Sequence, residues 1–491
     1  MSVDLHLPLR HLAQGRWSIA FLIAALLSSL ALTPLYAQSE PQSDSAPTIS
    51  DAELIREINA YVGQQFAEGK FSGTVLIAKE GEPIYQQAFG LASIAYEVPN
   101  RIDTKFNLGS MNKMFTAVAI AQLAEQGKLS FDDPISTHLP DYPNAEVAEN
   151  VTIHHLLTHT SGLADYFNDK FVEASRARFR TIEDFFPLFV DEPLQFEPGS
   201  EWSYSNSNFI VSGAIIEAVS GQNYFDYVRE HIYEPAGMSD TDAYELDRET
   251  PNLATGYTRA RGGNELRNNL FEHVIKGGPA GGGYSTAADL LAFAQALLAN
   301  ELLNDEMTTL VTEPKVAAQG PFDAHYGYGF MHETLNGYHR FGHSGGFEGI
   351  SSELNIYPEL GYVVVILSNF DPPAAPLVSL RIGKLLTGME IPQAIKLPPA
   401  DVLKFGNSYS LVGEAPGPGT LELEAEDGAL WLILGPDNRH RFLPLSATEF
   451  YDEEYEDVRI QFIVDEQGET TGLTIVGVST EVLEYVVASE E

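Results

Sequence analysis

The sequence has 491 residues, of which 44% are hydrophobic, a length that accommodates one large domain and a smaller one. It contains no cysteine, which excludes disulfides, a cysteine-linked lipid anchor and cysteine-ligated metal centres. The 28 Lys and Arg residues against 69 Asp and Glu give a formal net charge of -41, which would repel phosphates and argues against a nucleic-acid partner.

The N-terminus has the pattern of a secretory signal peptide over residues 1–37. Arg10 and Arg16 give a weakly positive start, and residues 17–32 form an apolar run that ends before a cleavage site preceding Gln38. An uncleaved membrane anchor is the alternative, but the apolar run is short for a membrane span. We therefore expect a periplasmic or secreted protein without a stable membrane anchor after cleavage. Residues 38–50 are a polar linker.

The segment 51–395 carries the signals of a mixed helix and strand domain. The pattern predicts helices over 51–66, from Ser110 to about Gly127, and over 152–157, 208–219 and 285–299. It predicts a β-hairpin over 73–85 and strands over 339–343, 350–357 and 362–369. Residues 165–200 show no clean period. An early hairpin and three late strands indicate one antiparallel sheet built from both ends of the segment, with helices packed on it, an α+β fold.

The C-terminal segment, 400–491, has a different composition after Leu397-Pro398-Pro399. Short runs of alternating apolar residues separated by turns predict a small all-β domain, either a sandwich or a barrel. It contains no recognisable set of catalytic residues. We expect it to be a structural or docking module.

Ser110 and Lys113 stand three residues apart in the first turn of a helix that is apolar almost all round from Met114 onwards. An N-cap serine beside a solvated lysine is the simpler interpretation of this pair. The alternative is a nucleophile with its base, since no other serine in the chain has a lysine three residues later.

Two further motifs add polar groups of catalytic type. Tyr204-x-Asn206 lies in a serine-rich stretch, where a tyrosine relays protons and an asparagine donates to a carbonyl, although a hydrogen-bonded turn gives the same pattern. Residues 341–346 read Phe-Gly-His343-Ser344-Gly345-Gly346, and glycines there let a substrate approach the backbone.

Taken in this order, Ser110-x-x-Lys113, Tyr204-x-Asn206 and His343-Ser344-Gly345 resemble the three motifs of the serine β-lactamase and penicillin-binding-protein superfamily. The resemblance covers roughly residues 50–390 and is greatest to the class C β-lactamase-like branch, with its DD-peptidase, D-aminopeptidase and esterase relatives. It implies an antiparallel sheet flanked by helices, with an all-helical subdomain, and activity without a metal or a cofactor.

The resemblance also implies a role for each motif residue. Ser110 is acylated, Lys113 is the base, Tyr204 carries protons, and Asn206 holds the substrate carbonyl. The N–H groups of Ser110 and Gly346 form the oxyanion hole. Substrate-binding positions are therefore Asn206, His343, Ser344, Gly345 and Gly346. β-Lactamases of this branch have lysine at the position of His343, and a neutral imidazole binds a carboxylate less well than an ammonium does.

Other patterns give weaker hypotheses. The run from Gly342 to Gly346 also fits a nucleophile elbow, with Ser344 as nucleophile and His440 as the available downstream histidine, but an elbow requires a helix after the strand. His155 and His159 have the spacing of zinc ligands without the accompanying glutamate. Gly281–Gly283 precede a helix, as in a phosphate loop, but lack its lysine.

We therefore predict an exported serine hydrolase that forms an acyl-enzyme on Ser110 and cleaves a carboxyl ester or a D-amino-acid amide or peptide bond. The alternatives are a β-lactamase, or a sensor that binds penicillin or cell-wall peptide without turnover. The expected partner is a small ester, lactam or cell-wall peptide.

Overall fold

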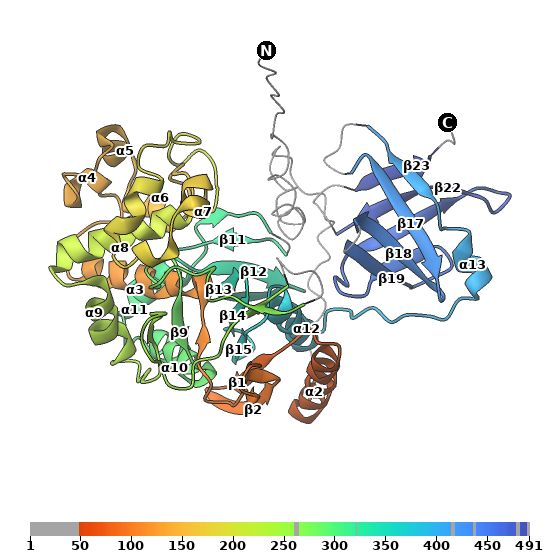
Figure 1. Ribbon diagram of the computed structural model, residues 1–491, viewed down its shortest axis with the longest axis horizontal. Coiled ribbons are helices and arrows are strands. Elements are labelled where there is room, and N and C mark those ends of the chain that lie inside the picture. The colour runs from red at the N-terminus through yellow and green to blue at the C-terminus, as the bar shows by residue number, and fades with distance from the viewer. Residues whose placement is uncertain are drawn as a thin grey trace, which may run out of the picture. The chain divides into compact units, whose positions relative to one another are not determined.

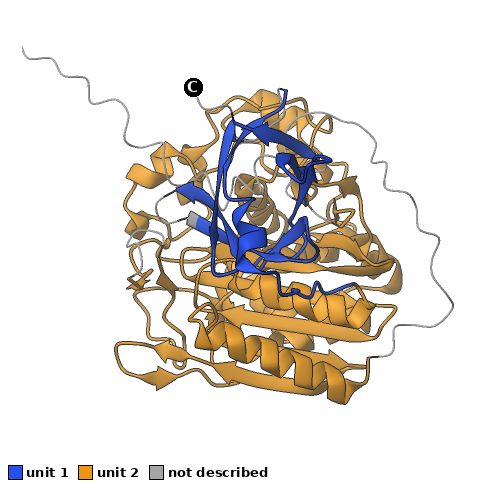
Figure 2. Cartoon of the chain, turned by 90° about the vertical axis from the view of Figure 1, so that its right-hand side faces the viewer, with its two compact units in different colours: residues 1–42, 390–491 blue, residues 43–389 orange. Residues whose placement is uncertain are grey.

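The structure is a computed structural model that describes residues 49–259, 265–320, 322–413, 418–435, 438–477 and 482–488. The chain divides between Met389 and Glu390 into two compact units, which Figure 2 shows in orange and blue. The predicted signal peptide, residues 1–37, lies outside the described residues. Within those residues, no helix combines the length and the apolar character needed to cross a membrane.

The larger unit is built on an eight-stranded sheet with all neighbouring strands antiparallel. The pairing of Gly73 with Ser368 and of Lys79 with Tyr362 places the first strand beside the last, so both ends of the unit meet in one sheet, as predicted. In spatial order the strands are β10 (Val316–Ala317), β11 (His325–Tyr326), β12 (Met331–Leu335), β13 (Tyr338–Phe347), β14 (Ile350–Tyr357), β15 (Tyr362–Ser368), β1 (Gly73–Lys79) and β2 (Glu82–Phe89).

Each face of this sheet is covered by helices, because side chains alternate between the two faces along every strand. On one face, Leu354 and Val365 join the core that contains α3 (Asn112–Glu125) and α10 (Ala287–Leu298). On the other face, Val364 packs with α2 (Asp51–Ala67) and α12 (Ala374–Thr387). This confirms the predicted α+β arrangement.

A group of helices lies beyond α3 and forms the helical subdomain, at the left of Figure 1. All residues of α3 from Asn112 to Leu123 are buried, because the helix is apolar all round and is enclosed by the sheet and by these helices. The helices of the group are α4 (Ile135–His138), α5 (Ala145–Asn150), α6 (Ile153–Leu157), α7 (Asp169–Glu173), α8 (Asn206–Ser220) and α9 (Tyr224–Val228).

The structure differs from the sequence prediction at several element boundaries. The strand expected over 339–343 is β13, which continues to Phe347 because its ladder with β14 runs on through the pairing of Gly346 with Ser351. Helix α8 begins two residues earlier than expected, at Asn206. Residues 165–200 form only short helical turns, and this explains why they show no clean period.

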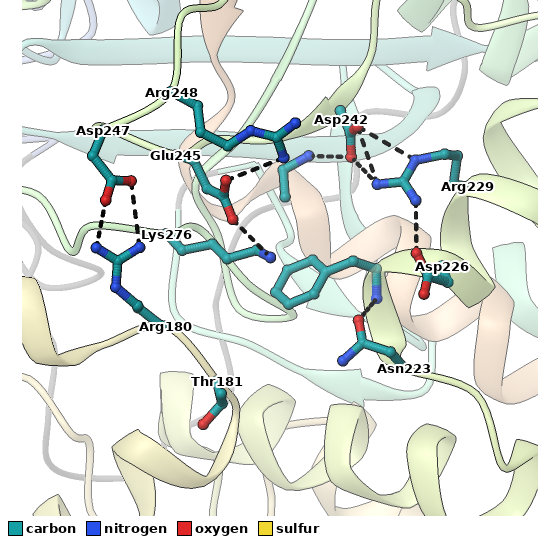
Figure 3. A network of polar contacts seen from close by, with 12 residues as sticks. Arg180, Thr181, Asn223, Asp226, Arg229, Asp242, Glu245, Asp247, Arg248 and Lys276 are labelled. Atoms are coloured by element: carbon teal, nitrogen blue, oxygen red, sulfur yellow. Dashed lines mark hydrogen bonds and ion pairs between the residues drawn. The ribbon is translucent and has the colours of Figure 1, made fainter.

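Ion pairs hold the chain segment that runs between β6 (Asp242–Ala243) and β9 (Gly283–Ser285) (Figure 3). Arg229 contacts Asp242 at 2.9 Å, and Lys276 contacts Glu245 at 2.9 Å. Strand β9 pairs with both β6 and β5 (Phe106–Asn107), and β5 leads directly to Ser110. The network therefore anchors a segment that lies against the start of α3.

The smaller unit is a closed eight-stranded barrel, which confirms the predicted all-β domain. Its core consists of side chains that alternate along the strands, such as Leu421 and Leu423, and a short helix α13 (Pro399–Leu403) precedes it. The strands are β16 (Ser408–Leu411), β17 (Thr420–Glu426), β18 (Ala429–Gly435), β19 (Asn438–Pro444), β20 (Glu449–Asp452), β21 (Arg459–Val464), β22 (Thr470–Val476) and β23 (Leu483–Val487).

Candidate active site

Ser110 lies on a tight turn at the N-terminal end of the buried helix α3. Residues Gly109–Met111 form one turn of 3-10 helix, and Gly109 adopts a left-handed φ of 53°, which a glycine tolerates without strain. Ser110 is half-buried, and its side chain is hydrogen-bonded to that of Tyr204. Two motifs that are far apart in the sequence are thus in direct contact.

Lys113 is fully buried beneath this turn. Its Nζ atom donates to Asn206 Oδ1 at 2.8 Å and to the Ala280 carbonyl oxygen at 2.5 Å. Burial lowers the pKa of Lys113 to about 7, against a smaller opposing effect of the Asp165 charge. A neutral amine that donates its two N–H bonds in this way keeps its lone pair for accepting a proton.

Tyr204 supplies the third polar group next to Ser110. Its ring lies 4.9 Å from Lys113 Nζ and packs on the His159 ring, with the ring centres 4.2 Å apart. Burial raises the pKa of Tyr204 above its usual value, and the hydrogen bond with Ser110 opposes this shift. The side chain is therefore a neutral phenol that is positioned to pass a proton.

Asp165 fixes the orientation of Asn206, the first residue of α8. Its Oδ2 atom accepts from the Asn206 backbone N at 3.1 Å and from Nδ2 at 2.8 Å, which turns Oδ1 toward Lys113. Burial raises the pKa of Asp165, and the hydrogen bonds it accepts lower it. Asp165 belongs to none of the three motifs, although it lies two residues after Leu163 in a stretch next to the predicted helix over 152–157.

His343 lies on β13 and is buried, with both ring nitrogens bonded inside the protein. Nδ1 donates to the Ser344 carbonyl oxygen at 2.5 Å, so Nε2 accepts from the Tyr326 hydroxyl at 2.9 Å. Burial lowers the pKa of His343 to about 3, and the charge of Lys113 in its protonated form contributes to the shift. The imidazole is neutral, and its two hydrogen bonds fix its position in the wall of the site. Tyr326, like Asp165, lies outside the three sequence motifs.

Gly345 and Gly346 bring the end of β13 against the turn that carries Ser110. A Cβ atom on Gly109 would lie 3.2 Å from the Gly346 backbone N, and one on Gly345 would lie 1.9 Å from the Leu108 carbonyl oxygen. Only a strand without side chains at these positions approaches so closely. The backbone of Gly346 is thereby placed beside that of Ser110.

Ser344 is the one predicted site residue whose side chain does not join the others. It pairs with Glu353 across the β13–β14 ladder, and its Oγ contacts Met331 Sδ at 3.6 Å on the face covered by α12. Strand β13 is followed by β14 and not by a helix, so the strand-to-helix turn of a nucleophile elbow is missing around Ser344. His440 lies in the barrel of the other unit, where it bonds Asp452 at 3.0 Å.

The histidine pair His155 and His159 and the glycine run 281–283 have structural roles in this region. His155 forms a capping box with Thr152, and His159 Nδ1 accepts from the Ser205 backbone N at 3.1 Å. In the described part of the chain, no group of three or more His, Asp or Glu side chains is arranged to hold a metal ion. Gly281–Gly283 pack against the turn that carries Ser110, where a Cβ on Gly281 would lie 2.9 Å from the Gly109 carbonyl oxygen.

An aromatic pair lies close to these residues. Phe167 follows Asp165 by two positions, and Phe347 directly follows Gly346; their rings stack with centres 5.6 Å apart. Phe167 is 41% exposed. The pair connects the helical subdomain to the end of β13 and presents an apolar surface next to the site.

The chain is similar to proteins of a known family. The sequence model of the family described as Beta-lactamase matches residues 54–388. The chain belongs to the Beta-lactamase family. A penicillin-binding protein of Bacillus subtilis (strain 168) is 29% identical to this family member, covering 78% of this chain and 88% of that protein.

Two solved structures extend the comparison. The penicillin-binding protein from Bacillus halodurans is 35% identical, with a TM-score of 0.61, covering 66% of this chain and 99% of that one. EstCE1, a hydrolase with promiscuous acyltransferase activity, is 25% identical, with a TM-score of 0.58, covering 70% of this chain and 100% of that one. This Beta-lactamase family protein is a serine hydrolase of the penicillin-binding-protein type.

Proposed function

We propose that this protein is an exported serine hydrolase that forms an acyl-enzyme on Ser110 and cleaves a carboxyl ester or a D-amino-acid amide or peptide bond. The observation that carries the proposal is the buried Lys113, whose pKa is lowered to about 7 directly beneath the serine turn. An amine that is neutral near pH 7 accepts the serine proton, which a solvated lysine does not do.

The proposed reaction has two halves. Lys113 takes the proton of Ser110, whose Oγ attacks the substrate carbonyl, and the developing oxyanion is held by the backbone N–H groups of Ser110 and Gly346. Tyr204 delivers a proton to the leaving group and regains one from the protonated Lys113, and Asn206 binds the substrate carbonyl through its amide. Water then attacks the acyl-enzyme, with Tyr204 or Lys113 taking its proton and passing it to Ser110 Oγ as the acid leaves.

The environment of His343 is the reason to rank ester and amide substrates above lactams. Its neutral ring, with both nitrogens already bonded, offers no positive charge to the carboxylate of a β-lactam. A β-lactamase, or a sensor that is acylated without turnover, is the second candidate, because relatives are named penicillin-binding proteins. EstCE1, named as a hydrolase with acyltransferase activity, supports chemistry through an acyl group.

We further propose residues 51–395 as the catalytic domain and residues 400–491 as an accessory domain. Export rests on the signal-peptide pattern of residues 1–37, and it places the enzyme in the periplasm or outside the cell.

The test uses the purified protein with a small p-nitrophenyl ester and, separately, with a fluorescent penicillin. We expect ester turnover and a Ser110-linked acyl adduct by mass spectrometry, both lost in Ser110→Ala. Ser344→Ala serves as the matched control and keeps the adduct, since its side chain lies on the other face of the sheet. Stable penicillin labelling without ester turnover would favour the sensor, and equal activity of wild type and Ser110→Ala would contradict the proposal.

A further inference from the structure

A cavity of about 180 Å³ lies between the sheet and α12, on the face opposite α3. Strand β13 contributes Arg340 and Ser344 to its lining, β14 contributes Glu353 and Asn355, and α12 contributes Ser379. Cross-strand pairing of Ser344 with Glu353 places both on this face. The lining lies entirely within the larger unit and also includes His343, but none of the proposed proton-transfer residues, Ser110, Lys113 and Tyr204, belongs to it.

The charges around the cavity do not balance. Arg340 is buried and is already paired with Glu333, with its Nε 2.9 Å from Glu333 Oε2, and it also donates to the Tyr357 hydroxyl at 3.2 Å. Glu353 accepts a hydrogen bond from Asn355 Nδ2 at 3.0 Å, but no cationic side chain of the described residues lies within ion-pair distance of it. With all three groups ionised, the lining carries one excess negative charge.

The pKa of the Glu353 carboxyl group reflects its position in the cavity wall. Burial raises the pKa of Glu353 to about 7, although Arg340 opposes the shift. A cation that enters the cavity would stabilise the ionised form of this desolvated carboxylate. The remaining walls include the apolar side chains of Met331, Pro376 and Leu380, which suit a hydrocarbon body.

We propose that this cavity binds a small organic ammonium ion, with the ammonium group on Glu353 and the apolar body against Met331 and Leu380. The volume is sufficient for one ring, since a cavity of about 150 Å³ holds benzene. Asn355 and Ser379, which are joined by a 2.8 Å hydrogen bond, provide oxygen atoms for the remaining N–H bonds.

The position of the cavity links it to the candidate active site. Ser344 forms part of the lining and stands two residues before Gly346, whose N–H is the proposed oxyanion donor on the same strand. A bound ammonium ion would therefore lie against the strand that also carries Gly346. The inference goes beyond the proposed function, because binding does not require turnover.

The test is isothermal titration calorimetry of the full chain with benzylammonium, with neutral benzyl alcohol as the size-matched control. We expect saturable 1:1 binding of benzylammonium and at least tenfold weaker binding of benzyl alcohol. Glu353→Gln, which keeps the shape and removes the charge, should weaken benzylammonium binding about 10- to 100-fold. Glu359→Gln, at an exposed glutamate in the turn after β14, should leave it unchanged.

Thermal unfolding of each variant establishes that it is folded, and Ser110→Ala separates this inference from the proposed function, since it should bind benzylammonium as wild type does. Equal affinity for benzyl alcohol and benzylammonium, or unchanged binding in Glu353→Gln, would overturn the proposal.

Discussion

The Nζ atom of Lys113 lies 2.8 Å from Oδ1 of Asn206, so α3 and α8 meet at their N-terminal ends through a buried hydrogen bond. This contact joins the Ser-x-x-Lys motif to the Tyr-x-Asn motif, although Lys113 and Asn206 are 93 positions apart in the sequence. It also holds an amine away from solvent, and burial of that amine is what lowers its pKa.

The first prediction concerns the pH dependence of ester hydrolysis. If neutral Lys113 is the base, kcat/KM should fall about tenfold per pH unit below pH 7, because protonation removes the lone pair. Lys113→Met should lower kcat/KM for ester hydrolysis about 10²- to 10⁴-fold at pH 8. Lys128→Met, at an exposed lysine just after the same helix, should keep wild-type activity. A flat profile between pH 5 and pH 8 would contradict the assignment.

The second prediction concerns Asp165 as a positioning residue. Asp165→Asn removes a negative charge that raises the pKa of Lys113, so the acid limb of the kcat/KM profile should move to lower pH. It also loosens Asn206, and we expect kcat/KM at pH 8 to fall about tenfold. A role limited to folding would lower thermal stability and leave the acid limb at the wild-type pH.

The third prediction concerns the glycine at the end of β13. Gly345→Ala would place a Cβ atom 1.9 Å from the Leu108 carbonyl oxygen, so the strand must move away from the nucleophile turn. Displacing the Gly346 N–H should cost about 10²- to 10³-fold in kcat. Gly63→Ala is the control: it lies inside α2 with open space around it, and alanine there should stabilise the fold by about 0.5–1 kcal/mol. Wild-type kcat in Gly345→Ala would refute the oxyanion role of this strand.

The fourth prediction concerns the aromatic pair of Phe167 and Phe347. If these rings contact the substrate, Phe167→Ala should lower kcat/KM about tenfold for a phenylbutyrate ester and much less for an acetate ester. Phe66→Ala provides the comparison, since Phe66 is also exposed and contacts Phe89, but on α2. The measurement is the ratio of kcat/KM for the phenylbutyrate ester to kcat/KM for the acetate ester. If this ratio is the same in Phe167→Ala and in wild type, the pair takes no part in substrate selection.

Much of the fold was predictable because its signals are local. The nearly continuous apolar runs of α3 and β15 are recognisable from their composition and length, and the change of composition after Pro399 marks the barrel. The short strands β10 to β12 were missed, since two-residue strands such as β11 carry no period of their own.

The residues that support the site were harder to find. Asp165 contacts Asn206 across 41 positions, and Tyr326 contacts His343 across 17, and neither pair has a spacing that secondary structure alone would bring together. Strand alternation also decides the position of Ser344, whose side chain turns away from its neighbour His343, a consequence that depends on which face of β13 packs on α3.

The sequence by itself determined the family, the α+β class and the set of motif residues, because each motif is short and the longer helices and strands have local sequence patterns. The tertiary structure alone decided the chemical state of those residues. Whether Lys113 is an amine or an ammonium, and whether His343 is free or already bonded, depends on burial and on partners that are distant in the chain. The desolvation of a side chain depends on residues that are distant in the sequence and come together only in the folded molecule, so a local sequence motif does not reveal it.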